Sequence, residues 1–251
     1  MKNIILNGCF GRMGRVITEI VDKSESLRIC AGVDAFSSDN ANFPVYKNIS
    51  DVKENADVII DFSNPSALDD LLCYATKTKT PIVLATTGFS SEQIEKIKNT
   101  TLQIPVFFTF NMSLGINLLT ALSKKAALVL GNDFDIEIVE KHHNQKLDAP
   151  SGTAIMLANS INELYGDSLQ YEYDRHSKRM ARPKNEIGIH SVRGGTIVGE
   201  HEVIFAGKDE VISLSHSAAS RDVFASGAVR AAQFICNKPA GLYDMNMLID
   251  N

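Results

Sequence analysis

Residues 140–154, EKHHNQKLDAPSGTA, gather side chains that exchange protons and bind carboxylates. His142 and His143 are adjacent, and Lys146 follows them in the same stretch. The stretch ends by opening a helical pattern, whose first residues are Ser151, Gly152 and Thr153. Imidazole and ammonium groups act as general acids and bases, and backbone N–H groups at a helix start hold anions. We therefore expect a pocket that binds a carboxylate, with His142 and Lys146 providing proton chemistry.

Three other interpretations of this stretch remain open. Adjacent histidines suggest a metal site, but no third ligand has suitable spacing and lysine is a poor ligand, so we expect no metal. Ser151 near a histidine suggests acyl transfer, but the G-x-S-x-G turn of hydrolases is missing. The residue types alone also allow a solvated loop.

A second candidate site is the glycine-rich turn GCFGRMG at residues 8–14, between the first expected strand and the first expected helix. Gly8 allows a tight turn, and Gly11 allows a phosphate to approach the backbone. The helix that follows directs N–H groups and its positive dipole end at such an anion, and Arg12 adds a charge. Phe10 replaces the usual middle glycine, so the turn is a variant, and a strand–helix connection without a ligand is the alternative.

Asp34 ends the second expected strand, about 20 residues beyond the turn, where a dinucleotide fingerprint places an acidic residue. A carboxylate there accepts hydrogen bonds from the adenosine ribose and disfavours a 2′-phosphate. Ala35 provides no cation for that phosphate. We expect NADH or NADPH as cofactor, with NADH favoured; the alternative is an aspartate that caps a helix or loop.

The elements that must position these residues follow from the apolar pattern. Five short apolar runs predict strands, at 3–8, 27–33, 57–62, 81–86 and 104–110. Helical patterns lie between them, at 12–24, 65–77 and 91–99. Near-continuous apolar strands that alternate with helices are typical of a parallel sheet covered on both faces. The first half is therefore predicted to be a Rossmann-like, doubly wound α/β domain.

The pattern changes after residue 112 and predicts a second, α+β domain with a mixed or antiparallel sheet. Its expected helices are 114–131 and 152–166, with a strand at 135–140 between them. Three further strands, which we expect to be antiparallel and joined by turns, are 185–194, 201–208 and 209–216. A last helix is predicted at 220–238.

Composition excludes several classes of protein. The chain of 251 residues is 44% hydrophobic and 22% charged, which is ordinary for a globular protein. Its net charge of −5 argues against nucleic-acid binding. The four cysteines form no CxxC pair, the N-terminus is too short for a signal peptide, and no apolar run approaches a membrane span. We expect a cytoplasmic protein with no membrane or nucleic-acid partner.

The chain resembles the dihydrodipicolinate reductase family of lysine and diaminopimelate biosynthesis from residue 4 to about residue 245. The segments that carry the resemblance are GCFGRMG, ATTGF, FNMSLG, EKHHNQKLDAPSGTA, VRGGTIVGEHEVIF and SRDVFASGAVRAAQF. The H-H-x-x-K-x-D-A-P-S-G-T-A pattern is the most specific, because the glycine turn alone is shared with other dehydrogenases. The resemblance implies reduction of a cyclic, conjugated imine dicarboxylate by NADPH or NADH, with loss of water from a 4-hydroxy substrate.

The resemblance also implies residue roles. His142 would be the general acid/base and Lys146 the proton donor. The carboxylates of the substrate would be held by His143, Lys146, Ser151, Gly152 and Thr153. The cofactor would contact Gly8, Cys9, Phe10, Gly11, Arg12, Met13 and Gly14. Asp34 would lie at the ribose, and the nicotinamide side would be bordered by Ala85, Thr86, Thr87, Thr109, Phe110, Asn111 and Met112.

The resemblance implies a homotetramer built through the sheet of the second domain, with the last helix returning to the first. The dinucleotide-binding domain would then be 1–112 with 221–251, and the substrate-binding and oligomerisation domain 113–220. Phe10 and Ala35 depart from the family, many of whose members have glycine and a basic residue at these positions.

Two other functions are weighed against a reductase. Another two-domain NAD(P)-dependent dehydrogenase of an amino or keto acid would share the glycine turn but would not need the histidine–lysine cluster. A non-catalytic nicotinamide sensor would need the turn but no proton donors. We assign no chemistry to the remaining histidines, nor to Arg193, Arg221 and Arg230, and expect His201 and His216 to be structural or surface residues.

Overall fold

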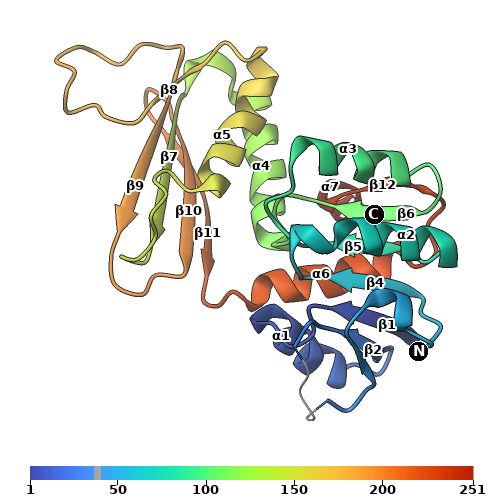
Figure 1. Ribbon diagram of the computed structural model, residues 1–251. Coiled ribbons are helices and arrows are strands. Elements are labelled where there is room, and N and C mark those ends of the chain that lie inside the picture. Colours follow the sequence, from blue (N-terminus) through green and yellow to red (C-terminus); the bar gives the residue numbers. More distant parts are fainter. Residues whose placement is uncertain (37–40, 251) are drawn as a thin grey trace. The chain divides into compact units, whose positions relative to one another are not determined.

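The protein folds as two compact units, described here from a computed structural model of residues 1–36 and 41–250 (Figure 1). Unit 1 is formed by Met1–Leu114 and Asp222–Asn251, and unit 2 by Gly115–Arg221. The chain therefore leaves unit 1 once and returns to it. The domain borders expected from the sequence, after residues 112 and 220, lie beside these two crossings.

Unit 1 contains a seven-stranded sheet in the order β12-β6-β5-β4-β1-β2-β3, and neighbouring strands in this order pair in parallel. Its strands are β1 (Lys2–Asn7), β2 (Leu27–Val33), β3 (Val45–Tyr46), β4 (Val58–Asp61), β5 (Ile82–Leu84), β6 (Pro105–Phe108) and β12 (Gly241–Tyr243). The strand order reverses between β1 and β4, which is where ligands bind in doubly wound sheets. The Rossmann-like expectation is confirmed, although β3 and β12 are too short to have been found by pattern.

Helices cover both faces of this sheet because successive strand residues point to opposite sides. Ile4 belongs to the core cluster that packs on α1 (Arg12–Asp22) and α6 (Asp222–Ile235). Its neighbour Ile5 belongs to the opposite cluster, which packs on α2 (Leu68–Thr78) and α3 (Ser91–Thr100). Both isoleucines are fully buried.

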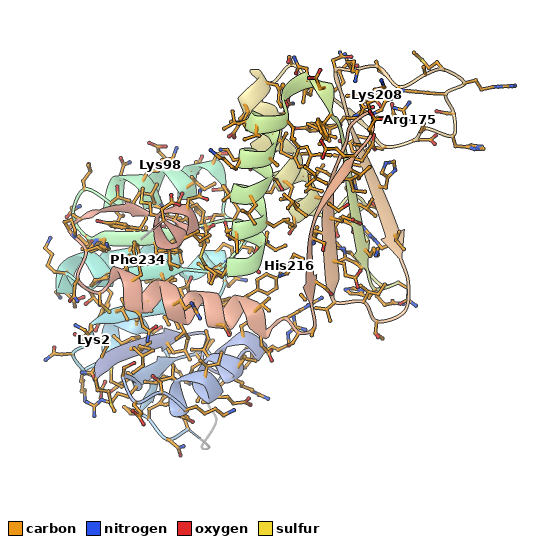
Figure 2. All side chains as sticks on the ribbon, turned by 180° about the vertical axis from the view of Figure 1, so that it is seen from behind. Lys2, Lys98, Arg175, Lys208, His216 and Phe234 are labelled. Atoms are coloured by element: carbon orange, nitrogen blue, oxygen red, sulfur yellow. The ribbon has the colours of Figure 1, made fainter. Side chains whose placement is uncertain are left out.

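The C-terminal segment completes unit 1. Helix α6 packs beside α1, and the short helix α7 (Met245–Ile249) follows β12 (Figure 1). Phe234, which is labelled in Figure 2, lies on α6 and makes edge-to-face contacts with Phe107 of β6 and Tyr243 of β12. These contacts connect residues far apart in the sequence, so unit 1 includes α6.

Unit 2 contains a five-stranded sheet in the order β11-β10-β7-β9-β8. Its strands are β7 (Asp135–His142), β8 (Gln170–Glu172), β9 (Glu186–Arg193), β10 (Gly199–Ala206) and β11 (Val211–Ala218). Strands β10 and β11 form the expected antiparallel hairpin. Strand β9 departs from the expectation, because it pairs in parallel with β7 and β8 instead of with β10. The sheet is mixed, because β7 lies between β9 and β10, the two strands that sequence order would have paired with each other.

Helices α4 (Leu114–Leu130) and α5 (Gly152–Asn162) contribute to the core of unit 2. Residues 114–133 are long and apolar enough for a membrane span by length and composition, with a mean hydropathy of 1.3, which corrects the expectation that no run approaches that length. Ile116, Leu119 and Ala127 of this segment are nevertheless buried in the unit 2 core. Core packing accounts for these three residues, whereas Leu118, Leu122, Leu128 and Val129 of the same segment are exposed.

Candidate active site

One face of strand β7 lies partly in the hydrophobic core of unit 2 and partly in a polar site. Its buried residues alternate, so Ile136, Ile138, Glu140 and His142 share one face. The two isoleucines lie in the hydrophobic core, and the two polar residues continue that face beyond it. The register places Glu140 opposite His201 of β10 and His142 opposite Arg193 of β9. Sheet pairing therefore assembles four titratable side chains from three strands.

The Glu140 carboxylate, which is fully buried, is the centre of this cluster. Arg193 donates to both of its oxygens, at 2.8 Å to Oε2 and 2.7 Å to Oε1. The Ser151 backbone N–H donates to Oε1 at 3.1 Å, and Nδ1 of His142 lies 2.6 Å from Oε2. A buried carboxylate requires such pairing, because an uncompensated charge is very costly away from water.

Burial and the main paired group act in opposite directions on the pKa values of Glu140 and His142. Burial would raise the pKa of Glu140, but hydrogen bonds, that from Arg193 the strongest, lower it to about 2. Burial lowers the pKa of His142, and Glu140 opposes that effect. Burial also lowers the pKa of His201, to about 4, with the neighbouring His142 adding to the shift. At neutral pH the carboxylate is charged and His201 is neutral.

The loop after β7 carries the predicted proton donor. The Lys146 backbone N–H donates to the carbonyl of His143 at 3.1 Å, which closes a turn. The Lys146 ammonium lies 2.8 Å from Oδ1 of Asp148, and that ion pair lowers the pKa of the aspartate. Arg193 also donates to the Asp148 carbonyl at 2.7 Å. The loop is thereby attached to β9.

Helix α5 begins at the predicted anion-binding segment. The Ser151 hydroxyl caps the helix by accepting from the Ala154 N–H at 3.2 Å, and it shares a hydrogen bond of 3.1 Å with Nε2 of His201. Ser151 is only 2% exposed, and its own N–H is donated to Glu140. Gly152 is exposed, with open space around its Cβ position. A carboxylate would reach Gly152 before Ser151.

The rings of His142 and His201 meet edge to face, with centroids 5.2 Å apart. Gly199 leaves room beside them, because a Cβ on that residue would lie 3.1 Å from Nε2 of His142. His143, the next residue, lies apart from this pair, and its Nε2 is 3.4 Å from the Arg221 guanidinium.

In unit 1 the glycine turn has the backbone geometry that its sequence predicts. Gly8 has φ of +81°, which L-residues with a side chain rarely adopt. A Cβ on Gly14 would overlap the carbonyl oxygens of Gly8 and Cys9, so the turn packs directly on the first helix. Gly11 is the N-cap of α1 and has no side chain over the first N–H groups. Arg12 is exposed, Met13 is half-buried and Cys9 is buried.

Asp34 fastens this turn to the end of β2. Its Oδ2 accepts from the Phe10 N–H at 2.9 Å, and its Oδ1 accepts from the Phe36 N–H at 3.1 Å. A pocket of about 780 Å³ opens beside it, lined by Gly8, Phe10, Gly11, Asp34 and Ala35 among others. Arg15 and Lys47 also line this pocket. The structure thus brings the turn and Asp34 together in one cavity.

The other predicted cofactor residues follow two neighbouring strands. Residues 85–87 follow β5 and residues 109–112 follow β6, and these strands pair from Ile82 to Leu84. Ala85, Thr86 and Met112 are buried, and Phe110 is 77% exposed. Close by, Asp61 ends β4 fully enclosed, and burial raises its pKa against hydrogen bonds from Ser63 and Asn7. These segments share the carboxyl edge of the sheet.

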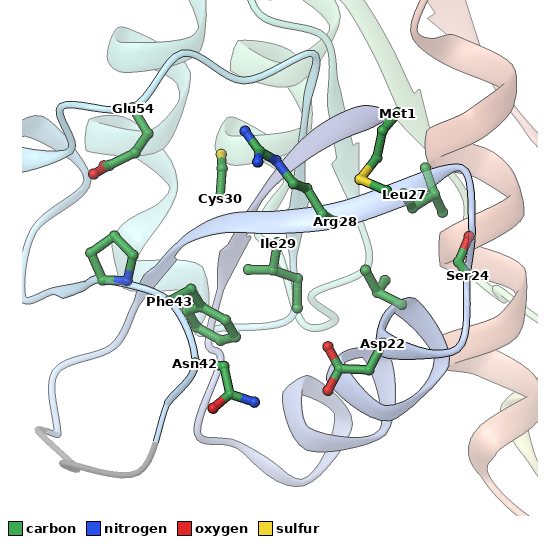
Figure 3. Close-up of a pocket in the computed structure, with 12 residues that line it drawn as sticks. Met1, Asp22, Ser24, Leu27, Arg28, Ile29, Cys30, Asn42, Phe43 and Glu54 are labelled. Carbon is green, nitrogen blue, oxygen red and sulfur yellow. The ribbon is translucent and has the colours of Figure 1, made fainter.

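A second pocket, of about 520 Å³, lies against β2 and is lined by Arg28, Ile29, Cys30, Phe43 and others (Figure 3). It contains none of the predicted site residues. Within residues 1–36 and 41–250, no group of three or more His, Cys, Asp or Glu side chains is placed to hold a metal ion.

Four residues of the unit 2 site were missed from the sequence as carriers of chemistry. Glu140 stands inside the quoted histidine segment, but its role depends on partners about 50 to 60 positions away. Arg193 and His201 lie in strands, where a structural role was expected. Arg221 contacts His143. The one feature of the sequence that could have indicated a role for Arg221 is its place in the SRDVFASGAVRAAQF segment, which carries part of the family resemblance.

Comparison with protein families accounts for both halves of the chain. A family model described as "Dihydrodipicolinate reductase, N-terminus" matches residues 2–112, and one described as "Dihydrodipicolinate reductase, C-terminus" matches residues 115–249. The first match covers the glycine turn and Asp34, and the second covers the Glu140–His142 cluster.

Individual relatives match over nearly their whole length. A 4-hydroxy-tetrahydrodipicolinate reductase from Caldanaerobacter subterraneus subsp. tengcongensis is 51% identical, over 99% of this chain and 98% of the relative. One from Clostridium tetani is 49% identical, over 100% and 98%. Among solved structures, the dipicolinate-bound dihydrodipicolinate reductase from Paenisporosarcina sp. TG-14 has a TM-score of 0.83 at 25% identity, covering 98% of this chain and 99% of that one.

Proposed function

The chain belongs to the dihydrodipicolinate reductase family, and from that premise we propose that it reduces 4-hydroxy-tetrahydrodipicolinate with a nicotinamide cofactor, in lysine and diaminopimelate biosynthesis. One molecule of substrate, one hydride and one proton give tetrahydrodipicolinate and water. The observation that carries the proposal is the cluster of Glu140, His142 and Lys146 beside the start of α5. Neither a generic dehydrogenase nor a non-catalytic sensor calls for this cluster.

The residues of unit 1 fit a dinucleotide. Gly8 forms the tight turn against the Phe62 backbone, and Gly11 leaves the start of α1 open, where N–H groups suit a pyrophosphate. Cys9, Phe10, Arg12, Met13 and Gly14 complete that turn. The cofactor supplies hydride when it is bound. Residues 85–87 and 109–112 lie at the edge of the sheet where the nicotinamide end is expected, and Asp34 retains lone pairs for the ribose.

Proton chemistry is assigned to unit 2. Hydride addition to an electron-poor ring carbon leaves an enamine-like anion, which needs a proton. Lys146 is the proposed donor, because its ammonium lies in the loop beside the cluster and pairs with the largely exposed Asp148. His142 is the proposed general acid/base beside it, with a pKa lowered by burial from the ordinary histidine value.

Substrate carboxylates are assigned to the start of α5 and to the cations next to it. Gly152 and Thr153 contribute backbone N–H groups at the positive end of the helix dipole, and Ser151 caps the helix. His143 and Lys146 add donors, and Arg221 stands at His143. The dipicolinate bound to the Paenisporosarcina relative is a small dicarboxylate of the kind such a pocket would hold.

NADH is the favoured cofactor in this proposal, with NADPH also accepted. The Asp34 carboxylate disfavours a 2′-phosphate, and Ala35 provides no charge to offset it. Lys47 follows Tyr46, which pairs with Val33 just before Asp34, so a cation lines the pocket beside the aspartate. That cation supports residual use of NADPH.

We also propose that the protein is a cytoplasmic homotetramer that associates through the unit 2 sheet. The outward residues of β11 alternate with half-buried ones along its whole length, which leaves one face of that strand available. Sedimentation equilibrium should give four times the chain mass of 27.5 kDa. A concentration-independent monomer would contradict this part of the proposal.

The proposed activity is tested by following nicotinamide absorbance with the fresh condensation product of pyruvate and aspartate semialdehyde. NADH and NADPH are offered in parallel to the same enzyme. Rapid oxidation that depends on the substrate is expected, faster with NADH. Folded protein that binds cofactor but oxidises neither would overturn the proposal and leave the sensor or another dehydrogenase.

A further inference from the structure

The surroundings of Glu140 restrict the proton on His142. Two N–H groups of Arg193 and the Ser151 backbone N–H point at the carboxylate oxygens. All three are obligate donors, so both oxygens already accept hydrogen bonds. The Ser191 side chain also hydrogen-bonds the carboxylate, and the remaining neighbour is Nδ1 of His142, which can be either a donor or an acceptor.

The ionisation state of the Glu140 carboxylate decides whether Nδ1 of His142 is a donor or an acceptor. A bidentate arginine on a fully buried carboxyl group strongly favours the ionised, acceptor-only form. With no proton on Glu140, the short contact of 2.6 Å requires a proton on Nδ1. A neutral His142 ring is then protonated at Nδ1 and has its lone pair at Nε2.

We propose that Glu140 and Arg193 form a positioning pair that fixes His142 as its Nδ1–H tautomer and anchors the loop of Lys146. The inference rests on the proposed function, because it concerns the site assigned to proton transfer. It also gives the two groups different roles. The neutral His142 presents an acceptor at Nε2, which leaves the ammonium of Lys146 as the proton source.

The second half of the proposal concerns the loop. Arg193 bridges the Glu140 carboxylate and the Asp148 carbonyl, and Asp148 holds the Lys146 ammonium through its side chain. Glu140 in turn accepts from the Ser151 N–H at the start of α5. One buried ion pair therefore connects the acid/base histidine, the lysine loop and the carboxylate-binding helix.

The remaining groups around His142 support this arrangement. His201 faces the ring edge to face and is neutral at pH 7, so it adds no competing charge. Lys146 and Arg193 are the cations that act on the ring, and both disfavour a second proton on it. Gly199 lies beside Nε2 and has no side chain to cover that atom.

The direct test is ¹⁵N NMR of the wild-type protein labelled at histidine, at pH values where His142 is neutral. The expected signals are a protonated Nδ1 and an unprotonated Nε2, assigned through loss of the signals in His142→Asn. A neutral ring protonated at Nε2 would overturn the proposal without any change to Glu140. This readout does not need turnover, so it separates failure of the pair from failure of the proposed reductase activity.

The mutational test uses Glu140→Gln, which removes charge but little volume. With its oxygen accepting from Arg193 and the Ser151 N–H, the amide turns an N–H donor toward Nδ1, so we expect the proton of His142 to move to Nε2 and kcat to fall about 10²-fold or more. The KM for NADH should change less than twofold, because the cofactor turn belongs to unit 1. Unchanged kcat with an unchanged tautomer would overturn the pairing.

Two further variants separate positioning from folding. Arg193→Lys keeps a cation but loses the double hydrogen bond, so kcat should fall while the thermal midpoint stays near that of the wild type. Glu137→Gln is the matched control, a carboxylate on the opposite face of β7 that pairs with Arg182 and His190. It should leave kcat and the His142 signals unchanged. Equal losses in Glu137→Gln and Glu140→Gln would show a structural role only.

Discussion

The two units hold their candidate sites by different means. In unit 1 the backbone does most of the positioning: Gly8 takes a positive φ, Gly14 packs against carbonyl oxygens, and α1 starts immediately after the turn. In unit 2 the positioning comes from side chains, with Glu140 bonded to residues from β7, β9 and the start of α5. A backbone site depends on a few glycines close in sequence, and a side-chain site depends on sheet register.

This difference teaches where each site is vulnerable. Backbone turns tolerate charge changes around them but not added atoms, because the space is filled by main chain. A buried ion-pair network tolerates little change of charge or protonation, because any unpaired member is left away from water. Substitutions and pH should therefore affect the two units in opposite ways.

The largest expected effect is that of Lys146→Ala on turnover. Removal of the proposed proton donor should lower kcat about 10³-fold, within the range for general acid–base catalysis. The dissociation constant of NADH, measured by fluorescence, should stay unchanged, because the cofactor turn lies in unit 1. Lys141→Ala is the control, since Lys141 pairs with Glu200 outside the cluster. Weakened NADH binding in Lys146→Ala would count against the assigned role.

The second largest effect is expected from acidification, which should change the stabilities of the two units in opposite directions. His201 is 5% exposed and its pKa lies at about 4, so the unfolded state binds more protons below about pH 6.5. Unit 2 should lose up to about 3 kcal/mol as the pH falls from roughly 6.5 to 4, and His142 and His216, whose pKa values are also lowered, add to this loss. Asp61 of unit 1 has a raised pKa, so its contribution has the opposite sign and favours folding on acidification.

Peptide-resolved hydrogen exchange at pH 7 and pH 5, corrected for intrinsic rates, measures this separation. Strands β7 and β10 should lose protection relative to β1 and β4. In His201→Gln the loss should shrink, because the residue that titrates is gone while an amide can still bond to Ser151. Equal loss of protection in both units would refute the link to buried histidines.

The fold could be predicted largely from local pattern. Five of the seven strands of unit 1 are apolar runs bounded by turns, and they were expected within a few residues of their observed ends. Strands β3 and β12 contain two and three residues, too few for a periodic signal. The parallel pairing of β9 with β7 was missed, because sequence order does not indicate that β7 lies between β9 and β10.

The candidate site was predictable where chemistry is concentrated in sequence. His142, Lys146 and Ser151 occupy one segment, so their residue types alone indicated proton and anion chemistry. Arg193 and His201 come from other strands, 53 residues from Glu140 and 50 from Ser151 respectively. Only the register of β9 and β10 against β7 reveals their part in the site. The bond from the Phe10 N–H to Asp34 agrees with the alternative given for that residue, an aspartate that caps a loop.

Two glycines of the turn should give separable effects of intermediate size. In Gly14→Ala the new methyl overlaps carbonyl oxygens of Gly8 and Cys9, so the protein should lose about 1–3 kcal/mol of stability in urea unfolding. In Gly11→Ala the methyl meets only the Gly8 carbonyl, at 3.2 Å, and otherwise enters the pocket. That variant should keep its stability but raise the KM for NADH about tenfold, equivalent to about 1.4 kcal/mol. The reverse pattern would mean that Gly11 is the packing residue.

The smallest effect should come from Lys47→Gln, and it tests whether unit 1 uses any side-chain charge for recognition. Lys47 is exposed, so its attraction to a 2′-phosphate is screened and should be worth under about 1 kcal/mol. The KM for NADPH should rise about two- to fivefold, while that for NADH stays the same, because NADH has no phosphate at that position.

The control for this prediction is Lys53→Gln, which changes a lysine outside the residues that line the pocket. Raised salt should weaken NADPH binding to the wild type and have little effect on Lys47→Gln, because the screened charge is then already missing. An equal rise in KM for both cofactors would instead place Lys47 among residues that shape the turn, and the cofactor site would then depend on its backbone alone.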